Sequence, residues 1–148
     1  ITSSSDEKLE KAKALGADFI VNYKAEPEWG SAVNAWSGEK GVDHVVEVGG
    51  PATLAQSINA CRVNGNIVLI GVLTGVKGDV PTAALMAKQI NLKGIIVGSR
   101  EHQNDFVNAL EASGIKPVID TSFSLDELAK AFEYEVNGKH FGKICIDI

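Results

Sequence analysis

The sequence predicts an α/β fold in which helices cover a parallel sheet. Strand-like runs rich in β-branched residues alternate with helix-like segments along 148 residues, and no low-complexity linker interrupts them. Glycines follow several strand-like runs, where a ligand can approach the backbone closely. The chain opens on the end of a strand, then a helix and a second strand. We therefore expect an incomplete, doubly wound parallel sheet that lacks its first strand.

The first half of the chain predicts three strands and three helices. A helix over about residues 5–15 has Ser4 and Glu7 at the spacing of a capping box, and Gly16 can end it in the left-handed conformation. Residues 19–23 form the next strand. The other elements are a helix that begins near Pro27 with Trp29, Val33 and Trp36 on one face, a mostly buried strand over 42–48, and a helix from Pro51 with Leu54, Ile58 and Cys61 on one stripe.

The second half predicts strands over 66–72 and 90–98, separated by a short helix over 81–88. After Gly98 the character of the sequence changes. A helix over 101–113, a short strand at 117–120, a second capping box from Ser124 to Glu127, a helix to about Asn137 and a strand over 143–148 follow. We assign residues 1–100 to a partial nucleotide-binding domain and 101–148 to elements that rejoin another domain.

Composition and charge exclude several classes of function. The net charge is -5, so nothing neutralises a run of phosphates, and this argues against nucleic acid or an anionic membrane as a partner. No apolar run approaches the roughly 20 residues that a membrane span needs. Cys61 and Cys145 lie far apart without a C-x-x-C motif, and we expect both to be reduced thiols in a cytoplasmic protein.

No motif in the chain carries out a reaction by itself. The sequence contains no G-x-G-x-x-G, no phosphate-binding G-x-x-x-x-G-K-[ST], no H-E-x-x-H and no G-x-S-x-G. His44, His102 and His140 are scattered, whereas metal ligands normally cluster. We predict no catalytic residue and no metal ligand within these residues.

The end of the first strand carries a cofactor signature. In a nicotinamide dinucleotide fold, a carboxylate at this point accepts from the 2′-hydroxyl of NAD and repels the 2′-phosphate of NADP. Here the stretch is Ser3-Ser4-Ser5, and the first carboxylate is Asp6, inside the helix. Hydroxyls, the helix N-terminus, Lys8 and Tyr23 can converge on a phosphate, which favours NADP(H) over NAD(H). Taken singly, each residue has a simpler role: the serines cap the helix, Lys8 is a surface cation and Tyr23 packs at an edge.

Five segments together resemble the medium-chain dehydrogenase/reductases, a family of zinc alcohol dehydrogenases and NADPH-dependent quinone and enoyl reductases. They are S-S-S-D-E-K-L-E-K-A-K-A-L-G-A-D, V-D-H-V-V-E-V-G-G, G-N-I-V-L-I-G-V, L-K-G-I-I-V-G-S-R and G-K-H-F-G-K. The resemblance covers essentially the whole chain. It implies a Rossmann-type sheet of order 3-2-1-4-5-6 from which the first strand and the glycine-rich loop are missing.

The resemblance also implies roles for individual residues. Those at Ser3 and Ser4 flank the adenosine ribose, and those at Lys8 and Tyr23 bind the 2′-phosphate in NADPH-preferring branches. The remaining cofactor contacts are Val48 and Gly49 at the nicotinamide-side ribose or the pyrophosphate, Gly71, Val72, Ile96 and Val97 at the nicotinamide, and Gly142 and Lys143 as the chain closes.

The expected function is therefore the NADP(H)-binding portion of an oxidoreductase that transfers hydride to or from a carbonyl, an alcohol or an activated double bond. The resemblance places the catalytic groups, and zinc where a member has it, in an N-terminal domain that is missing before Ile1, so this chain alone is expected to be inactive. It also implies a small-molecule substrate and a homo-oligomer formed through the 90–98 edge strand. The alternative is a non-catalytic, truncated module that binds a nucleotide or only associates with other chains.

Overall fold

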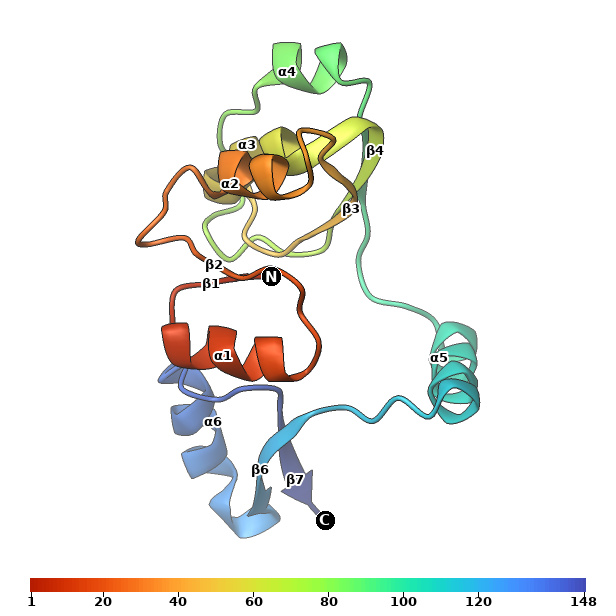
Figure 1. Ribbon diagram of the computed structural model, residues 1–148. Helices are drawn as coiled ribbons and strands as arrows, with labels where there is room; N and C mark the ends of the chain where they lie inside the picture. Colours follow the sequence, from red (N-terminus) through yellow and green to blue (C-terminus); the bar gives the residue numbers. More distant parts are fainter. The chain divides into compact units, whose positions relative to one another are not determined.

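The computed structural model describes residues 1–148, which form two compact units, Ile1–Val97 and Gly98–Ile148. Each unit contains helices and parallel strands (Figure 1). The first unit contains β1 (Thr2–Ser3), α1 (Asp6–Ala14), β2 (Val21–Asn22), α2 (Trp29–Trp36), β3 (Val42–Glu47), α3 (Pro51–Ala60), β4 (Cys61–Leu69), α4 (Thr82–Ala87) and β5 (Asn91–Gly94). None of the helices in the chain is both long enough and apolar enough to cross a membrane.

All strand pairs of the first unit are parallel, which confirms the predicted fold class. β1 pairs with β2, while β3, β4 and β5 form a separate sheet in that order. No ladder joins β1 to β3, so each of these strands has an unpaired edge. In the expected strand order the missing strand lies between these two edges, and the division of the sheet agrees with that expectation.

The core of the first unit lies between α3 and the three-stranded sheet. Leu54, Ile58, Cys61 and Ile67 are buried together, and Val45, Leu85, Ile90 and Leu92 pack around them. Leu54 and Ile58 thus form the predicted buried stripe of α3, while Cys61 is buried beside them as the first residue of β4 rather than as part of the helix. Pro51 begins α3 because its fixed φ suits the first turn of a helix and its missing N–H is not needed there.

The predicted burial of β3 is wrong. Of the six residues Val42–Glu47, only Glu47 is buried, and Val46 is 66% exposed. The helix in contact with this strand is α3, which covers one face, and the edge toward β1 is unpaired. A run of β-branched residues is typical of a strand that is buried on both faces, whereas α3 covers only one face of β3 here.

Trp29, Val33 and Trp36 share one face of α2 as predicted, but that face is only partly buried. The buried residue of α2 is Gly30, while Trp36 is 50% exposed. Trp36 stacks on Phe19, with ring centroids 5.2 Å apart. A residue without a side chain lies at the helix contact because α2 and α3 approach closely there.

The cap of α1 lies one residue later than predicted. Ser5, with extended backbone, is the N-cap, and its Oγ accepts a hydrogen bond from the N–H of Lys8 at 3.3 Å. The expected box between Ser4 and Glu7 does not form, because Ser5 is the N-cap and Lys8 takes the third helical position; Glu7 pairs with Lys11 at 2.8 Å. Gly16 has a φ of 105°, as its predicted role at the helix end requires.

The second unit contains α5 (Arg100–Ser113), β6 (Ile119–Ser124), the 3₁₀ turn η1 (Leu125–Glu127), α6 (Leu128–Val136) and β7 (Lys143–Asp147). β6 and β7 pair in parallel, and α6 contacts both strands (Figure 1). The second predicted capping box does not form, since the Ser124 hydroxyl contacts the Glu127 carboxylate rather than capping the backbone. A capping box forms instead at the start of α5, between Ser99 and His102.

Candidate functional site

The serines at the end of β1 organise the backbone of the first candidate site. Ser3 Oγ accepts from the N–H of Ser5 at 3.2 Å, and Ser5 Oγ accepts from the N–H of Lys8. The carbonyl of Ser3 accepts from the N–H of Tyr23 at 3.0 Å, which brings Tyr23 to the end of β1. The structure therefore gathers the backbones of Ser3, Ser4, Lys8 and Tyr23 around one strand end. The serine hydroxyls that accept these bonds can still donate, because a hydroxyl has one donor as well as two acceptor sites.

The carboxylate of Asp6, the first residue of α1, also lies at this strand end. Asp6 Oδ1 accepts from the side-chain amide of Asn22 at 2.6 Å, and Asn22 Oδ1 accepts from the N–H of Lys24 at 3.0 Å. Asp6 follows β1 and Asn22 ends β2. Because β1 and β2 pair in parallel, their carboxyl ends lie side by side. A sequence that predicts two adjacent parallel strands therefore also predicts that Asp6 and Asn22 come close together. Asp6 brings a negative charge that opposes a bound phosphate.

The carboxyl end of β3 forms the second candidate site. Glu47 is 3% exposed, and its carboxylate accepts from the backbone N–H groups of Gly49 at 2.7 Å and Gly50 at 2.9 Å. It also accepts from Thr53 Oγ1 at 2.6 Å and from the Ser57 hydroxyl. Sequence reasoning did not identify Glu47 as a site residue. Both glycine N–H groups point to its carboxylate, so neither is available to a phosphate.

The loop after β4 is bonded to the loop after β3. Thr74 donates to the carbonyl of Gly49 from both its N–H and its Oγ1, each at 2.8 Å, and Thr74 Oγ1 accepts from the N–H of Ala52 at 3.0 Å. A side chain at Gly71 would collide with the carbonyl oxygen of Val48. Glycine is therefore required where the two strand ends meet. Val48 and Val72, the neighbours of Gly49 and Gly71, are 48% and 50% exposed.

The last predicted residues of the first unit follow β5. Ile95 still donates to the carbonyl of Leu69 at 3.0 Å, but β5 ends at Gly94, so the predicted strand over 90–98 is too long. Ile96 and Val97 are 87% and 94% exposed. Val97 also has a φ of 41°, which is unusual for a β-branched residue. Because β3, β4 and β5 are parallel, their carboxyl ends, and the predicted residues that follow them, lie along the same edge of the sheet.

Gly142 and Lys143 belong to the second unit. They line a small hollow against α6 and β7, and His140 lines it too. The Nδ1 of His140 is buried without a hydrogen-bond partner. A side chain at Gly142 would collide with the carbonyl oxygen of Val118, so this position packs tightly against the start of β6. The hollow is lined by Leu128, Ala131, Phe132, Glu135, His140, Gly142, Lys143, Ile144 and Ile146.

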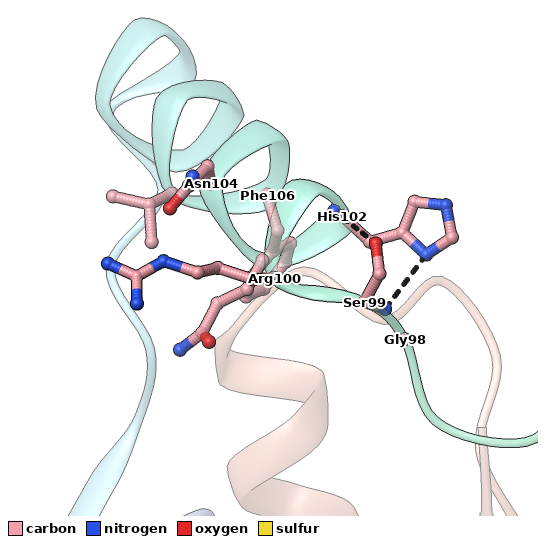
Figure 2. A pocket seen from close by; sticks show the side chains of 8 residues that line it. Gly98, Ser99, Arg100, His102, Asn104 and Phe106 are labelled. Atoms are coloured by element: carbon pink, nitrogen blue, oxygen red, sulfur yellow. Dashed lines mark hydrogen bonds between the residues drawn. The ribbon is translucent and has the colours of Figure 1, made fainter.

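An open hollow beside the first turns of α5 contains none of the predicted site residues. Its lining comes from Gly98, Ser99 and the adjoining turns of this one helix. Figure 2 shows Ser99 and His102 joined by two hydrogen bonds, while Arg100 extends on the other side of the helix. The bonds cap α5, so the local geometry here is that of a helix start.

The carboxyl groups whose pKa is shifted lie in exposed ion pairs. Lys11 lowers the pKa of Glu7, Arg62 lowers the pKa of Asp43 and Lys130 lowers the pKa of Glu127, in each case through a hydrogen bond and the opposite charge. No group of three or more His, Cys, Asp and Glu side chains is arranged to hold a metal ion. These pairs connect neighbouring turns or strands and do not mark an acid or base for catalysis.

Comparison with known proteins decides the family. The model of the zinc-binding dehydrogenase family matches residues 1–114. The chain belongs to this family. The predicted resemblance to the medium-chain dehydrogenase/reductases is confirmed, and so is the Rossmann-type fold of the nucleotide-binding domain.

Individual relatives agree with the family. The zinc-type alcohol dehydrogenase-like protein C1773.06c of Schizosaccharomyces pombe is 42% identical over 153 residues, which cover 100% of this chain and 44% of that protein. Quinone oxidoreductase-like protein 2 of Mus musculus is 28% identical over 99% of this chain and 44% of its own length. The chain thus spans less than half the length of these curated relatives.

Solved structures match over nearly the whole chain. A crystal structure from Sinorhizobium meliloti 1021 has a TM-score of 0.90 and 40% identity, covering 99% of this chain and 42% of that one. The structure of an NAD-dependent alcohol dehydrogenase has a TM-score of 0.87 and 31% identity, covering 99% and 43%. The fold of this zinc-binding dehydrogenase segment is therefore that of the corresponding part of its longer relatives.

Proposed function

We propose that this chain is the NADP(H)-binding portion of a zinc-type alcohol dehydrogenase-like oxidoreductase. The observation that carries the proposal is the row of parallel strand ends in the first unit, each followed by residues that suit a dinucleotide. Open α/β sheets bind their ligands at this edge. Gly71 lets the end of β4 pack against the backbone of Val48, and the exposed Val72, Ile96 and Val97 offer an apolar surface for a nicotinamide ring.

In this proposal the bound cofactor supplies the hydride at the nicotinamide, and the chain's own residues bind and orient it. The carboxylate of Glu47 occupies both glycine N–H groups of its loop, which supports a ribose rather than a pyrophosphate next to Val48 and Gly49. The substrate is a small carbonyl compound, alcohol or activated alkene. The catalytic groups and any zinc ligands come from the protein outside these 148 residues. A cytoplasmic location remains part of the proposal.

The preference for NADP(H) is supported by Ser3, Ser4, Lys8 and Tyr23, with no carboxylate in residues 3–5. Asp6 is the observation that opposes it, because its carboxylate lies at the same strand end. The hydrogen bond that Asp6 accepts from Asn22 partly offsets the negative charge of Asp6, and Lys8, one turn along the helix, supplies a positive charge. The preference for NADP(H) therefore depends on the balance between the positive charge of Lys8 and the negative charge of Asp6.

Replacing Lys8 by Ala together with Tyr23 by Phe tests this balance in the longer protein. We expect NADPH binding, followed by nicotinamide fluorescence, to weaken by roughly 1.5–3 kcal/mol, the range for charge-assisted hydrogen bonds, while NADH binding stays nearly unchanged. Asp6→Asn is expected to strengthen NADPH binding relative to NADH. Lys13→Ala removes an exposed lysine from the last turn of the same helix and serves as the control.

Equal losses for the two cofactors would show that no 2′-phosphate pocket exists at this strand end. A longer protein that binds neither cofactor and oxidises NADPH with no carbonyl, quinone or enone would refute the proposed oxidoreductase function. It would leave the alternative of a non-catalytic module.

A further inference from the structure

Glu47 is a buried carboxylate without a cationic partner. The ion pairs of the chain join Glu7 with Lys11, Asp43 with Arg62 and Glu127 with Lys130, and none of them includes Glu47. Its residue is 3% exposed. A carboxylate removed from water is costly unless hydrogen bonds satisfy its oxygens. The surroundings of Glu47 must therefore supply donors.

The donors all come from the segment that directly follows Glu47. Oε1 accepts from the N–H groups of Gly49 and Gly50 and from Thr53 Oγ1, at 2.7, 2.9 and 2.6 Å. Oε2 accepts from the Ser57 hydroxyl, one turn further along α3. One side chain at the end of β3 thus holds the loop after the strand and the first two turns of the next helix.

The two glycines of this loop have no side chains that could fix its shape. Gly49 and Gly50 are both buried, and Gly50 has a φ of 93°, a conformation that glycine adopts at little cost. Gly50 is the N-cap of α3 and can offer no capping side chain. The carboxylate of Glu47 takes that place, and its negative charge lies favourably at the N-terminus of the helix.

The same loop is the one that the proposed function places against the cofactor. Its outer side is bonded to Thr74 through the carbonyl of Gly49, and its inner side is bonded to Glu47. Because hydrogen bonds hold both sides of the loop, they fix the backbone of Val48 and Gly49 relative to Gly71. Loss of the inner bonds leaves two glycines free to rotate.

We propose that Glu47 is a positioning residue for cofactor binding: its buried carboxylate holds the 48–50 loop in the shape that receives the dinucleotide, without touching the dinucleotide. This rests on the proposed function. A purely structural role would make Glu47 important for the stability of α3 and irrelevant to the affinity of the folded protein for its cofactor.

The test is Glu47→Gln in the longer protein, which keeps the size of the side chain but replaces one acceptor oxygen by a donor NH₂ group. We expect the dissociation constant for NADPH, measured by fluorescence well below the unfolding temperature, to rise roughly tenfold or more, as the loss of bonds to a charged group implies. The amide protons of Gly49 and Gly50 are expected to exchange faster with solvent. Glu111→Gln makes the same change of charge at an exposed position of α5 and is the matched control.

If the Glu47→Gln variant does not fold, a second pair of variants tests the same proposal. Thr53→Val removes one donor to the carboxylate, and Thr53→Ser restores it. We expect the valine variant to bind NADPH more weakly and the serine variant to bind like the unaltered protein. Equal weakening in both would overturn the role of the hydroxyl and, with it, the proposal.

The outcomes separate the two proposals. Unchanged affinity in a folded Glu47→Gln variant, beside an unaltered protein that binds NADPH, overturns the positioning role and leaves the proposed function intact. An unaltered protein that binds no nicotinamide cofactor overturns the proposed function, and the positioning role falls with it.

Discussion

Gly30 lies at a close contact between α2 and α3. Its N–H donates to Gln56 Oε1 at 2.9 Å. A Cβ atom at this position would collide with the backbone oxygen of Gln56 and come within 3.0 Å of Asn59 Cβ. The backbone of α3 cannot move away without disturbing Ile58, which is 1% exposed in the core.

Gly30→Ala therefore sets two effects against each other. Alanine favours a helix interior by about 1 kcal/mol over glycine, whereas forcing an extra carbon into a packed contact costs about 1–3 kcal/mol. We expect a net loss of stability, measured as a lower urea midpoint of unfolding. Gly94→Ala, with nothing within 4 Å of the added carbon, is the control. A stabilised Gly30→Ala variant would show that the two helices can separate easily.

Asp6 and Asn22 show how a residue's role depends on its neighbour across strands. In the sequence, Asp6 is simply an acid in the first turn of a helix, a common position that suits the helix dipole. The hydrogen bond to Asn22 turns it toward the end of β2. No local pattern marks this pair, since the residues are 16 positions apart and meet only after β1 and β2 pair.

The end of α3 is held by a lysine from another helix. The Nζ of Lys88, the residue that caps α4, donates to the carbonyls of Ile58, Asn59 and Cys61 at 3.1, 2.6 and 2.9 Å. The last carbonyls of a helix lack partners within it, and a positive charge at this end also suits the helix dipole. One side chain thus joins α4 to the end of α3 and to the start of β4.

Lys88→Met is expected to lower the free energy of unfolding by roughly 1.5–3 kcal/mol, because partly buried carbonyls lose a charged donor. Methionine keeps the apolar stem of the side chain, so the loss reports the ammonium group. Lys93→Met, at an exposed position of β5, controls for the change in net charge. If the Lys88→Met and Lys93→Met variants unfold at similar temperatures, Lys88 does not stabilise the end of α3.

Strands β3 and β4 are joined at their start by an exposed ion pair. Arg62 Nε donates to Asp43 Oδ1 at 2.5 Å and lowers the pKa of that carboxyl. A lowered pKa in the folded state means that any stabilisation is present above the ordinary pKa of aspartate and disappears as the pH falls. Salt and solvent keep such a surface pair weak, so the pairing of the two strands depends mainly on the hydrogen bonds of their ladder.

The sheets leave several edges without partners. β1 and β3 each lack a neighbour on one side, and β5 pairs only with β4. Ile96 and Val97, just beyond β5, are among the most exposed apolar residues of the chain. Unpaired edges and exposed apolar side chains favour association with another chain or segment.

For the edge at β5 we propose a second copy of the same protein. Pairing β5 with its equivalent would satisfy the outward N–H and C=O groups of both copies. We expect light scattering of the longer protein to give the mass of a dimer across a dilution series. A monodisperse monomer would exclude this edge as the subunit contact.

The elements themselves were predictable because their signals are local. Pro51 and the spacing of Leu54 and Ile58 predicted α3, and a β-branched run predicted β3 almost to its ends, whereas β4 begins at Cys61, well before the predicted start at residue 66. Capping was predicted less well, since Ser4 and Ser5 offer the same chemistry. The choice between them depends on which residue has extended backbone once β1 is paired.

The sequence by itself determined the fold class and the family, because periodicity, glycine positions and segment order are properties of the chain. Only the tertiary structure decided which side chains come together at the strand ends. The carboxylate of Glu47 turns toward Gly49 and Gly50, and that of Asp6 turns toward Asn22. Charged residues are expected to be exposed, and Asp6 is; Glu47 is buried because the loop after β3 and the first turns of α3 supply donors to its carboxylate, while the pairing of β1 with β2 brings Asn22 to Asp6.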